Sequence, residues 1–211
     1  MGDIIDTAVR NLILKAGLEP DDILRAFLRP IVISGHLDPE EELERWKFLR
    51  SIVGDFSSYD IFFAQDITQR PDKTTALLYE GIEDTCRKTG HQAFVPSKSV
   101  GFPGDEHELQ PRDSYVLIND IMIPNTKVVL AYIGLQSTDV GMMMGRTIRA
   151  KKPMIYICEE ENEKNVLELY DYPKVVGFVK FTDLADCCDK LETEINKFFD
   201  KENKKESAPF N

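Results

Sequence analysis

The stretch from Lys127 to Glu161 decides the fold: it reads KVVLAYIG, then LQSTDVGMMMGRTIRAKKP, then MIYICEEE. Val128 to Ile133 is an apolar run rich in β-branched residues, which is typical of a strand buried on both faces. Ser137 to Asp139 are residue types that cap helices, and the spacing that follows predicts a helix through Ala150. Met154 to Cys158 predicts a second buried strand. A strand, a helix and a strand within about 30 residues indicate a parallel βαβ unit.

The rest of the chain extends this pattern to five βα units. Tyr59 to Ile67 predicts the first strand, a helix follows through Lys88, and HQAFVPSK predicts the second strand. Val175 to Phe181 predicts the last strand, and Leu184 to Phe199 a closing amphipathic helix. Parallel units of this kind build an open sheet with helices on both faces. We therefore expect a three-layer α/β/α fold with a five-stranded, mostly parallel, Rossmann- or flavodoxin-like sheet.

A helical extension precedes this domain. The spacing predicts a helix over residues 3–17 and a second from Asp21 that Pro30 interrupts, with Ile31 to Ser34 as a short strand. We assign residues 1–55 to this extension, 56–200 to the α/β domain and 201–211 to a flexible tail. The extension carries no chemical motif, so packing against the domain or oligomerisation is its expected role.

Composition excludes several classes of function. A net charge of -11 disfavours a broad nucleic-acid or membrane surface. No apolar run reaches the roughly 18 residues that span a bilayer, and no signal pattern is present, so we expect a cytoplasmic protein. The histidines are scattered, the cysteines lack CxxC spacing, and no P-loop or dinucleotide motif occurs. We expect no metal and no cofactor.

Ligands of open α/β sheets bind beyond the carboxyl ends of the strands. That rule selects Gln65 and Asp66 after the first strand, Ser97 after the second, Gly134 to Gly141 after the third and Glu159 to Glu161 after the fourth. Each position also has a structural interpretation, because Ser137 or Thr138 caps a helix equally well and the acids suit solvated loops. Arg146 suits either a ligand phosphate or an ion pair within the chain.

The segment NDIMIPNTKVVLAYIG…STDVGMMMGRTIRAKKPMIYI resembles the nucleoside 2-deoxyribosyltransferase-like family, and the similarity covers roughly residues 58–160. YDIFFAQDI resembles the first strand of that family and AFVPSK the second. The resemblance implies a nucleoside- or nucleotide-sized pocket and, in active members, transfer or hydrolysis at an N-glycosidic bond. The family places its nucleophilic glutamate in G-x-E-x-G, and this chain has Met143 there.

A thioether cannot form the glycosyl ester that a carboxylate nucleophile forms. Three hypotheses follow: a nucleoside- or nucleotide-binding protein without the reaction, a divergent N-glycosidase or deoxyribosyltransferase that uses another carboxylate, or an oligomeric interaction module with a vestigial pocket. The expected partners are a nucleoside or nucleotide and further copies of the chain, without nucleic acid or membrane. The candidate catalytic residues are Asp139, Asp120 and Asp66; the candidate ligand-binding residues are Gln65, Asp66, Ser97, Gly134, Ser137, Thr138, Asp139, Gly141, Met143 and Arg146.

Overall fold

The computed structural model describes residues 2–134, 137–163 and 172–206, and the chain divides into two compact units. The helical unit comprises Met1–Ser58 and Leu109–Asn125, and the α/β unit comprises Tyr59–Glu108 and Thr126–Asn211. The sequence assigned only residues 1–55 to the helical part. The difference is the later segment, Leu109–Asn125, which lies within the predicted α/β domain but clusters with the N-terminal helices.

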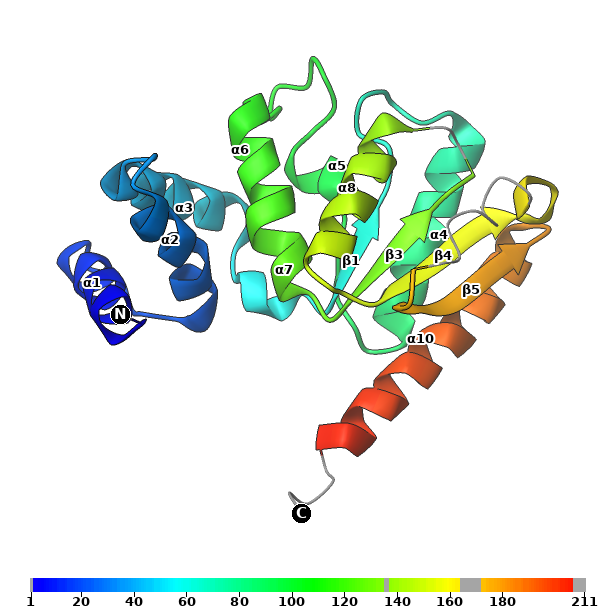
Figure 1. Ribbon diagram of the computed structural model, residues 1–211. Helices are drawn as coiled ribbons and strands as arrows, with labels where there is room; N and C mark the ends of the chain where they lie inside the picture. Colours follow the sequence, from blue (N-terminus) through cyan, green and yellow to red (C-terminus); the bar gives the residue numbers. More distant parts are fainter. Residues whose placement is uncertain (1, 135–136, 164–171, 207–211) are drawn as a thin grey trace. The chain divides into compact units, whose positions relative to one another are not determined.

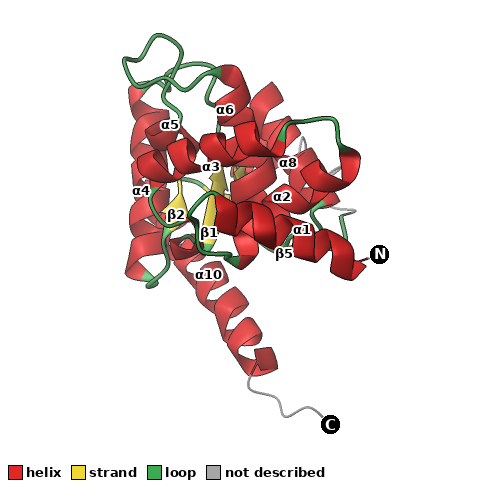
Figure 2. Ribbon diagram, turned by 90° about the vertical axis from the view of Figure 1, so that its left-hand side faces the viewer, coloured by secondary structure: helices red, strands yellow, loops and turns green. Residues whose placement is uncertain are grey.

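Three helices form the body of the helical unit: α1 (Gly2–Lys15), α2 (Asp22–Ser34) and α3 (Pro39–Val53). A 3-10 turn, η1 (Phe56–Ser58), follows α3. Trp46 of α3 is 1% exposed, and its ring lies 5.4 Å from that of Phe27 and 4.8 Å from that of Phe56. These aromatic contacts hold α2, α3 and η1 around one small apolar centre, and Figure 2 shows the helices that take part.

The predicted strand at Ile31 to Ser34 is wrong, because α2 continues through Pro30 to Ser34. Leu28 is fully buried and Ile31 is 7% exposed, so helical continuation buries apolar residues on both sides of the proline. That burial outweighs the hydrogen bond that proline cannot donate. Gly35 then ends the helix in the left-handed conformation at φ 63°, where its N–H reaches the Ile31 carbonyl.

A buried acid attaches the later segment of the helical unit to α3. Glu42 is 1% exposed, and its carboxylate accepts a hydrogen bond from Arg112 at 2.6 Å and one from Arg45. Arg45 also donates to Asp113 at 2.7 Å. A buried carboxylate is tolerated only when paired, and two guanidinium groups satisfy it here. The network therefore explains why residues 109–125 belong with residues 1–58.

The apolar spacing from Arg112 to Asn125 predicts one regular helix, and a helix forms there, but its central turns are wider than those of an α-helix. It consists of α6 (Pro111–Tyr115), the π-helix η2 (Val116–Met122) and α7 (Ile123–Asn125). The N–H of Ile123 donates to the Ile118 carbonyl, an i to i−5 bond that widens the turn. The apolar spacing predicted the helix but could not reveal this local change of period.

The α/β unit contains a five-stranded sheet in which every described pairing is parallel. Its strands are β1 (Ile61–Ala64), β2 (Ala93–Phe94), β3 (Val128–Tyr132), β4 (Met154–Glu159) and β5 (Val175–Phe181). Their order across the sheet is β2-β1-β3-β4-β5. The predicted fold class is confirmed. From β1, the chain first adds β2 on one side and then returns to add β3, β4 and β5 on the other side. The crevice between β1 and β3 is therefore the expected place for a ligand.

Helices cover both faces of the sheet (Figure 1). Helices α4 (Lys73–Lys88) and α10 (Leu184–Glu206) pack on one face, and α8 (Thr138–Arg149) packs on the other against β1 and β3. The short α5 (Pro96–Ser99) follows β2 directly. Helix α10 extends to Glu206, into the stretch that the sequence assigned to a tail. The short helix expected around Val166 to Tyr170 lies outside the described residues.

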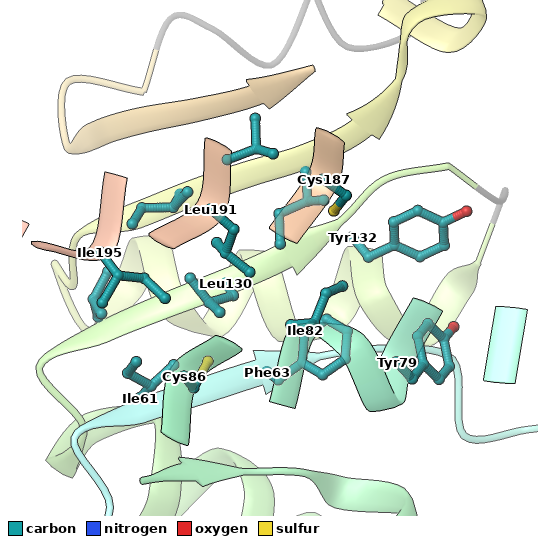
Figure 3. Packing of buried hydrophobic residues seen from close by; sticks show 14 of the residues in the cluster. Ile61, Phe63, Tyr79, Ile82, Cys86, Leu130, Tyr132, Cys187, Leu191 and Ile195 are labelled. Carbon is teal, nitrogen blue, oxygen red and sulfur yellow. The ribbon is translucent and has the colours of Figure 1, made fainter. Parts of the chain in front are cut away.

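The core on the face of α4 and α10 consists of alternate strand residues and the apolar sides of the two helices (Figure 3). Phe63 of β1, Leu130 of β3 and Ile82 of α4 are fully buried there, as is Leu191 of α10. Because strand side chains alternate between faces, each strand supplies residues to both layers. This packing fixes α4 and thereby the loop that joins it to β1.

We predict that Ile82→Ala lowers the free energy of unfolding by about 2–5 kcal/mol, because it removes methylene groups from a fully buried site and leaves a cavity. Leu77→Ala is the matched control in the same helix, since Leu77 is 47% exposed, and should change stability by less than about 0.5 kcal/mol. Urea denaturation followed by circular dichroism measures both. Equal losses in the two variants would contradict the packing of α4 on this face.

Candidate functional site

Gln65 and Ser97 meet beyond the carboxyl ends of β1 and β2. The amide nitrogen of Gln65 donates to the Ser97 hydroxyl, as the rule for parallel sheets predicts for residues at one edge. Gln65 is fully buried, and its amide oxygen has no hydrogen-bond partner among the described residues. Turning the amide over would leave its NH₂ group unpaired instead. An unsatisfied buried amide is costly, so this position favours a hydrogen-bonding partner from outside the described chain.

Asp66 and Asp139 come together at the switch point between β1 and β3. Both residues are buried, with 8% of each exposed. Asp66 accepts hydrogen bonds from the Thr68 backbone N–H at 2.8 Å and from the Thr68 hydroxyl at 2.7 Å. Asp139, in the first turn of α8, accepts from the Ile67 N–H at 3.3 Å. The two acids therefore brace the loop after β1 from both sides.

Burial raises the pKa of Asp139 above its ordinary value, and the negative charge of Asp66 raises it further. The hydrogen bond from the Ile67 N–H opposes this shift because it stabilises the carboxylate. An acid held beside a second carboxylate in this way is suited to carry a proton or to accept one from a ligand. Of the three predicted catalytic acids, the structure brings these two into one place.

Asp120, the third candidate acid, belongs to the other compact unit. It is an exposed residue of η2 and belongs to the helical unit, whereas Asp66 and Asp139 belong to the α/β unit. Asp120 was a candidate because the family that the sequence resembles carries an Asp on the helix before this strand. The segment that carries Asp120 joins the helical unit through the ionic network around Glu42. Because the partners in this network are far apart in sequence, no local pattern predicts the attachment.

Gly134 and Glu159 form a tightly packed corner after β3 and β4. The Tyr132 hydroxyl donates to the Glu159 carboxylate, and Asn162 donates to the same carboxylate at 3.2 Å. A Cβ on Gly134 would overlap both the Glu159 carboxylate and the Tyr132 hydroxyl. Gly134 is thus needed for close packing, and Glu159 is engaged with the chain. Glu160 and Glu161 are exposed, and Glu160 pairs with Lys180 at 3.6 Å.

The start of α8 has a cap made by the chain itself. The Ser137 hydroxyl accepts from the Val140 N–H at 3.3 Å, which is the structural role the sequence left open. Thr138 and Gly141 are exposed, and Arg146 is half-buried. Met143 is only 3% exposed and Met144 is 6% exposed, while Met142 is 59% exposed. Met143 is therefore a core residue of α8, whereas the neighbouring Met142 is exposed.

A cavity of 280 Å³ adjoins Asp66 on the side of α4. Its lining combines Asp66 with the loop that follows β1 and with the first turns of α4: Asp66, Gln69, Arg70, Pro71, Asp72, Thr75 and Tyr79. Asp72 caps α4 by accepting from the Thr75 N–H at 2.8 Å. Burial raises the pKa of Tyr79 to about 12, so its phenol stays protonated. The sequence did not select Arg70 or Tyr79, since neither follows a strand end directly.

The loop after β2 is attached to this rim. Arg70 forms an ion pair with Asp105, and its guanidinium lies 5.8 Å from the centre of the Phe102 ring. Asp105 also accepts from the Phe102 N–H at 2.9 Å, which closes the loop into a turn. Through Asp105 and Phe102, the polar stretch that begins at Ser97 thus reaches a residue that lines the cavity.

A scan of the chain against protein-family models finds no match, and a search of curated proteins finds no significant similarity. Within the described ranges, no group of three or more His, Cys, Asp or Glu side chains could hold a metal ion. Over the same ranges, no helix is both long and apolar enough to cross a membrane. The four cysteines all lie in described segments and are free.

We predict that Gly134→Ala destabilises the protein by about 1–3 kcal/mol, because the added methyl group overlaps Glu159 and Tyr132. Gly145→Ala is the control, since a Cβ there meets no described heavy atom and α8 gains a better helix former. It should leave stability unchanged or raise it by up to about 1 kcal/mol. Thermal unfolding measures both, and a neutral Gly134→Ala would refute the tight corner.

A second prediction concerns Asp139. Because its pKa is raised in the folded state, ionisation favours unfolding as the pH rises above the unfolded value of about 3.9. Asp139→Asn removes this effect while keeping an oxygen for the Ile67 N–H. The variant should therefore gain stability relative to the native chain as the pH rises from about 4 towards neutrality. Urea unfolding at several pH values tests this, with Asp189→Asn at an exposed position of α10 as the control.

Proposed function

We propose that the α/β unit binds a nucleoside beyond the carboxyl end of β1, between the loop that follows this strand and the first turns of α4. The observation that carries the proposal is the cavity of 280 Å³ that Asp66, Arg70 and Tyr79 line together. Its volume is just below the roughly 300–1,000 Å³ of common small-molecule pockets, which suits one nucleoside rather than a dinucleotide. The resemblance to the nucleoside 2-deoxyribosyltransferase-like family supports the same ligand class.

Each lining group matches one part of a nucleoside. The Asp66 carboxylate can accept hydrogen bonds from the sugar hydroxyls, because one of its oxygens carries the Thr68 bonds and the other remains for a ligand. The Tyr79 ring offers an apolar surface for a base, and the N-terminal turn of α4 offers polar backbone groups. Gln65 precedes Asp66 in the chain but is not among the residues that line the cavity, so its amide oxygen is not part of this match.

The charge of the lining favours a neutral ligand. Asp66 and Asp72 place two carboxylates in the cavity wall against the single guanidinium of Arg70, which Asp105 already pairs. A triphosphate would meet net repulsion there. A nucleoside, or at most a monophosphate directed towards Arg70, is compatible with the balance.

Binding without cleavage follows from the residue at the position of the family nucleophile. Met143 has no ionisable group and is 3% exposed, so neither its chemistry nor its accessibility suits attack on a sugar carbon. The Met143 side chain instead packs in the core of the unit. This favours a sensor or regulatory protein over an enzyme.

One observation favours a second candidate, a divergent N-glycosidase. Asp66 and Asp139 lie together, and the raised pKa of Asp139 resembles the pairing of one acid and one carboxylate in glycoside hydrolysis. Incubation with purine and pyrimidine nucleosides, with free base read by chromatography, tests this candidate. Base release that Asp139→Asn abolishes would establish it, and no release from any ligand that binds would exclude it.

We predict that a nucleoside at a hundred times its dissociation constant stabilises the protein by about 2.7 kcal/mol in thermal unfolding. Asp66→Asn should weaken this binding about tenfold, because the charge-assisted bonds to the sugar are lost while the Thr68 contacts remain possible. Arg70→Gln should weaken a nucleoside monophosphate but not the nucleoside. Arg87→Gln is the matched control, since the Arg70 and Arg87 side chains are both 70% exposed.

No shift with any nucleoside or monophosphate would contradict the proposal. It would favour the remaining hypothesis, an oligomeric module with a vestigial pocket, and the oligomeric state measured by light scattering would then decide that alternative.

A further inference from the structure

A second hollow of the α/β unit lies at the opposite ends of the strands from the nucleoside pocket, beside the amino ends of β4 and β5. Its volume is 860 Å³, and its lining comes from the segments that lead into these strands and from the C-terminal half of α10. From α10 it receives Lys197, Lys201 and Lys205, which at a spacing of four residues share one side of the helix. Glu202 is the one carboxylate among its described lining residues.

Four further lysines reach the hollow from other segments. Lys151 and Lys152 follow α8, Lys174 precedes β5, and Lys127 precedes β3. We call this surface the lysine groove: Lys127, Lys151, Lys152, Lys174, Lys197, Lys201 and Lys205. In a chain with a net charge of -11, a concentration of cations from four separate segments requires an explanation.

Ion pairs within the chain neutralise only part of the groove. Lys197 pairs with Glu194 at 3.1 Å, Lys205 with Glu202 at 2.6 Å and Lys127 with Asp60 at 3.1 Å. Lys151, Lys152, Lys174 and Lys201 form no ion pair with a carboxylate of the described residues. Burial lowers the pKa of Lys152, and the positive charge of Lys174 lowers it further. The Lys174 ammonium group also donates a hydrogen bond to the Lys151 carbonyl, which places these neighbouring lysines in one part of the groove.

The backbone that presents two of these lysines is itself constrained. Lys151 has φ 55°, in the left-handed region where glycine is the usual residue after a helix. Its N–H donates to the Ile148 carbonyl at 3.0 Å, and that of Lys152 donates to the Thr147 carbonyl at 3.0 Å. A charged side chain occupies a position where glycine would avoid the strain, which is consistent with a use for the charge.

We propose that the lysine groove binds a compact polyanion of the oligophosphate class, such as a small molecule that carries several phosphate groups. Ammonium groups from several segments, four of which no carboxylate of the described residues pairs, surround one concave space. Ammonium groups bind phosphate as point charges. The volume lies in the range of small-molecule pockets. A long nucleic acid would extend past the groove over a chain of net negative charge, which opposes it.

This site is independent of the proposed nucleoside pocket, because the two lie at opposite ends of the strands and differ in charge. Isothermal titration calorimetry of the full chain with inorganic tripolyphosphate tests it directly. The native chain should bind, and the double variant Lys152→Gln, Lys174→Gln should bind about tenfold more weakly. Lys73→Gln with Lys88→Gln is the matched control, since it removes the same charge from the two ends of α4 and should change binding by less than about twofold.

Circular dichroism establishes that the variants are folded, and Lys201→Gln on the surface of α10 provides a second variant should the first unfold. It should also weaken tripolyphosphate binding severalfold. Absence of binding by the native chain, or equal weakening by the groove and control variants, would overturn the proposal. Tighter binding of a single-stranded oligonucleotide or of anionic lipid vesicles than of tripolyphosphate would overturn it as well, because the ligand would then not be compact.

Discussion

The parallel pairing of β3 between β1 and β4 is the constraint on which the α/β unit depends. All five residues of β3 are buried, so this strand needs neighbours on both edges and helices on both faces. Because β2 already occupies the other edge of β1, the chain must turn back across the sheet between β1 and β3. That reversal leaves the two strand ends without a crossing helix between them, and Asp66 and Asp139 meet there.

Most of the α/β fold could be predicted because its signals are local. The continuous apolar runs of β3 and β4, the capping residues before α4 and α8, and the amphipathic spacing of α10 each act within a short window. The failures depend on distant contacts. Pro30 indicated a break, but burial of Leu28 and Ile31 against other helices kept α2 intact. Leu109–Asn125 looked like part of the α/β domain until Glu42 accounted for its attachment.

The candidate site was predictable to the extent that strand ends define it. The edge rule selected Gln65, Asp66 and Ser97, and the structure brings Gln65 to Ser97 and Asp66 to Asp139. It could not select Tyr79, which belongs to the second turn of α4 and lines the cavity from there, with its ring 5.4 Å from that of Phe63 in β1. The structure shows that Ser137 caps a helix and that Met143 packs in the core. In both cases a local pattern allowed two roles, and only the neighbours of the side chain distinguish them.

Among the charged residues, carboxylates predominate in the lining of the cavity at the carboxyl ends of the strands, and lysines in that of the hollow at their amino ends. Helix dipoles account for part of this difference. Asp72, Asp139 and Asp186 lie at the starts of α4, α8 and α10, and Lys151 and Lys205 lie at or beyond the ends of α8 and α10, as the dipoles favour. The dipole effect declines within one helical turn, however. Lys174 and Lys127 precede strands and belong to no helix. Lys127 pairs with Asp60, but no carboxylate of the described residues pairs with Lys174, so Lys174 adds charge to the lysine groove beyond what the helix ends require. This excess is the charge that the proposed anion would compensate.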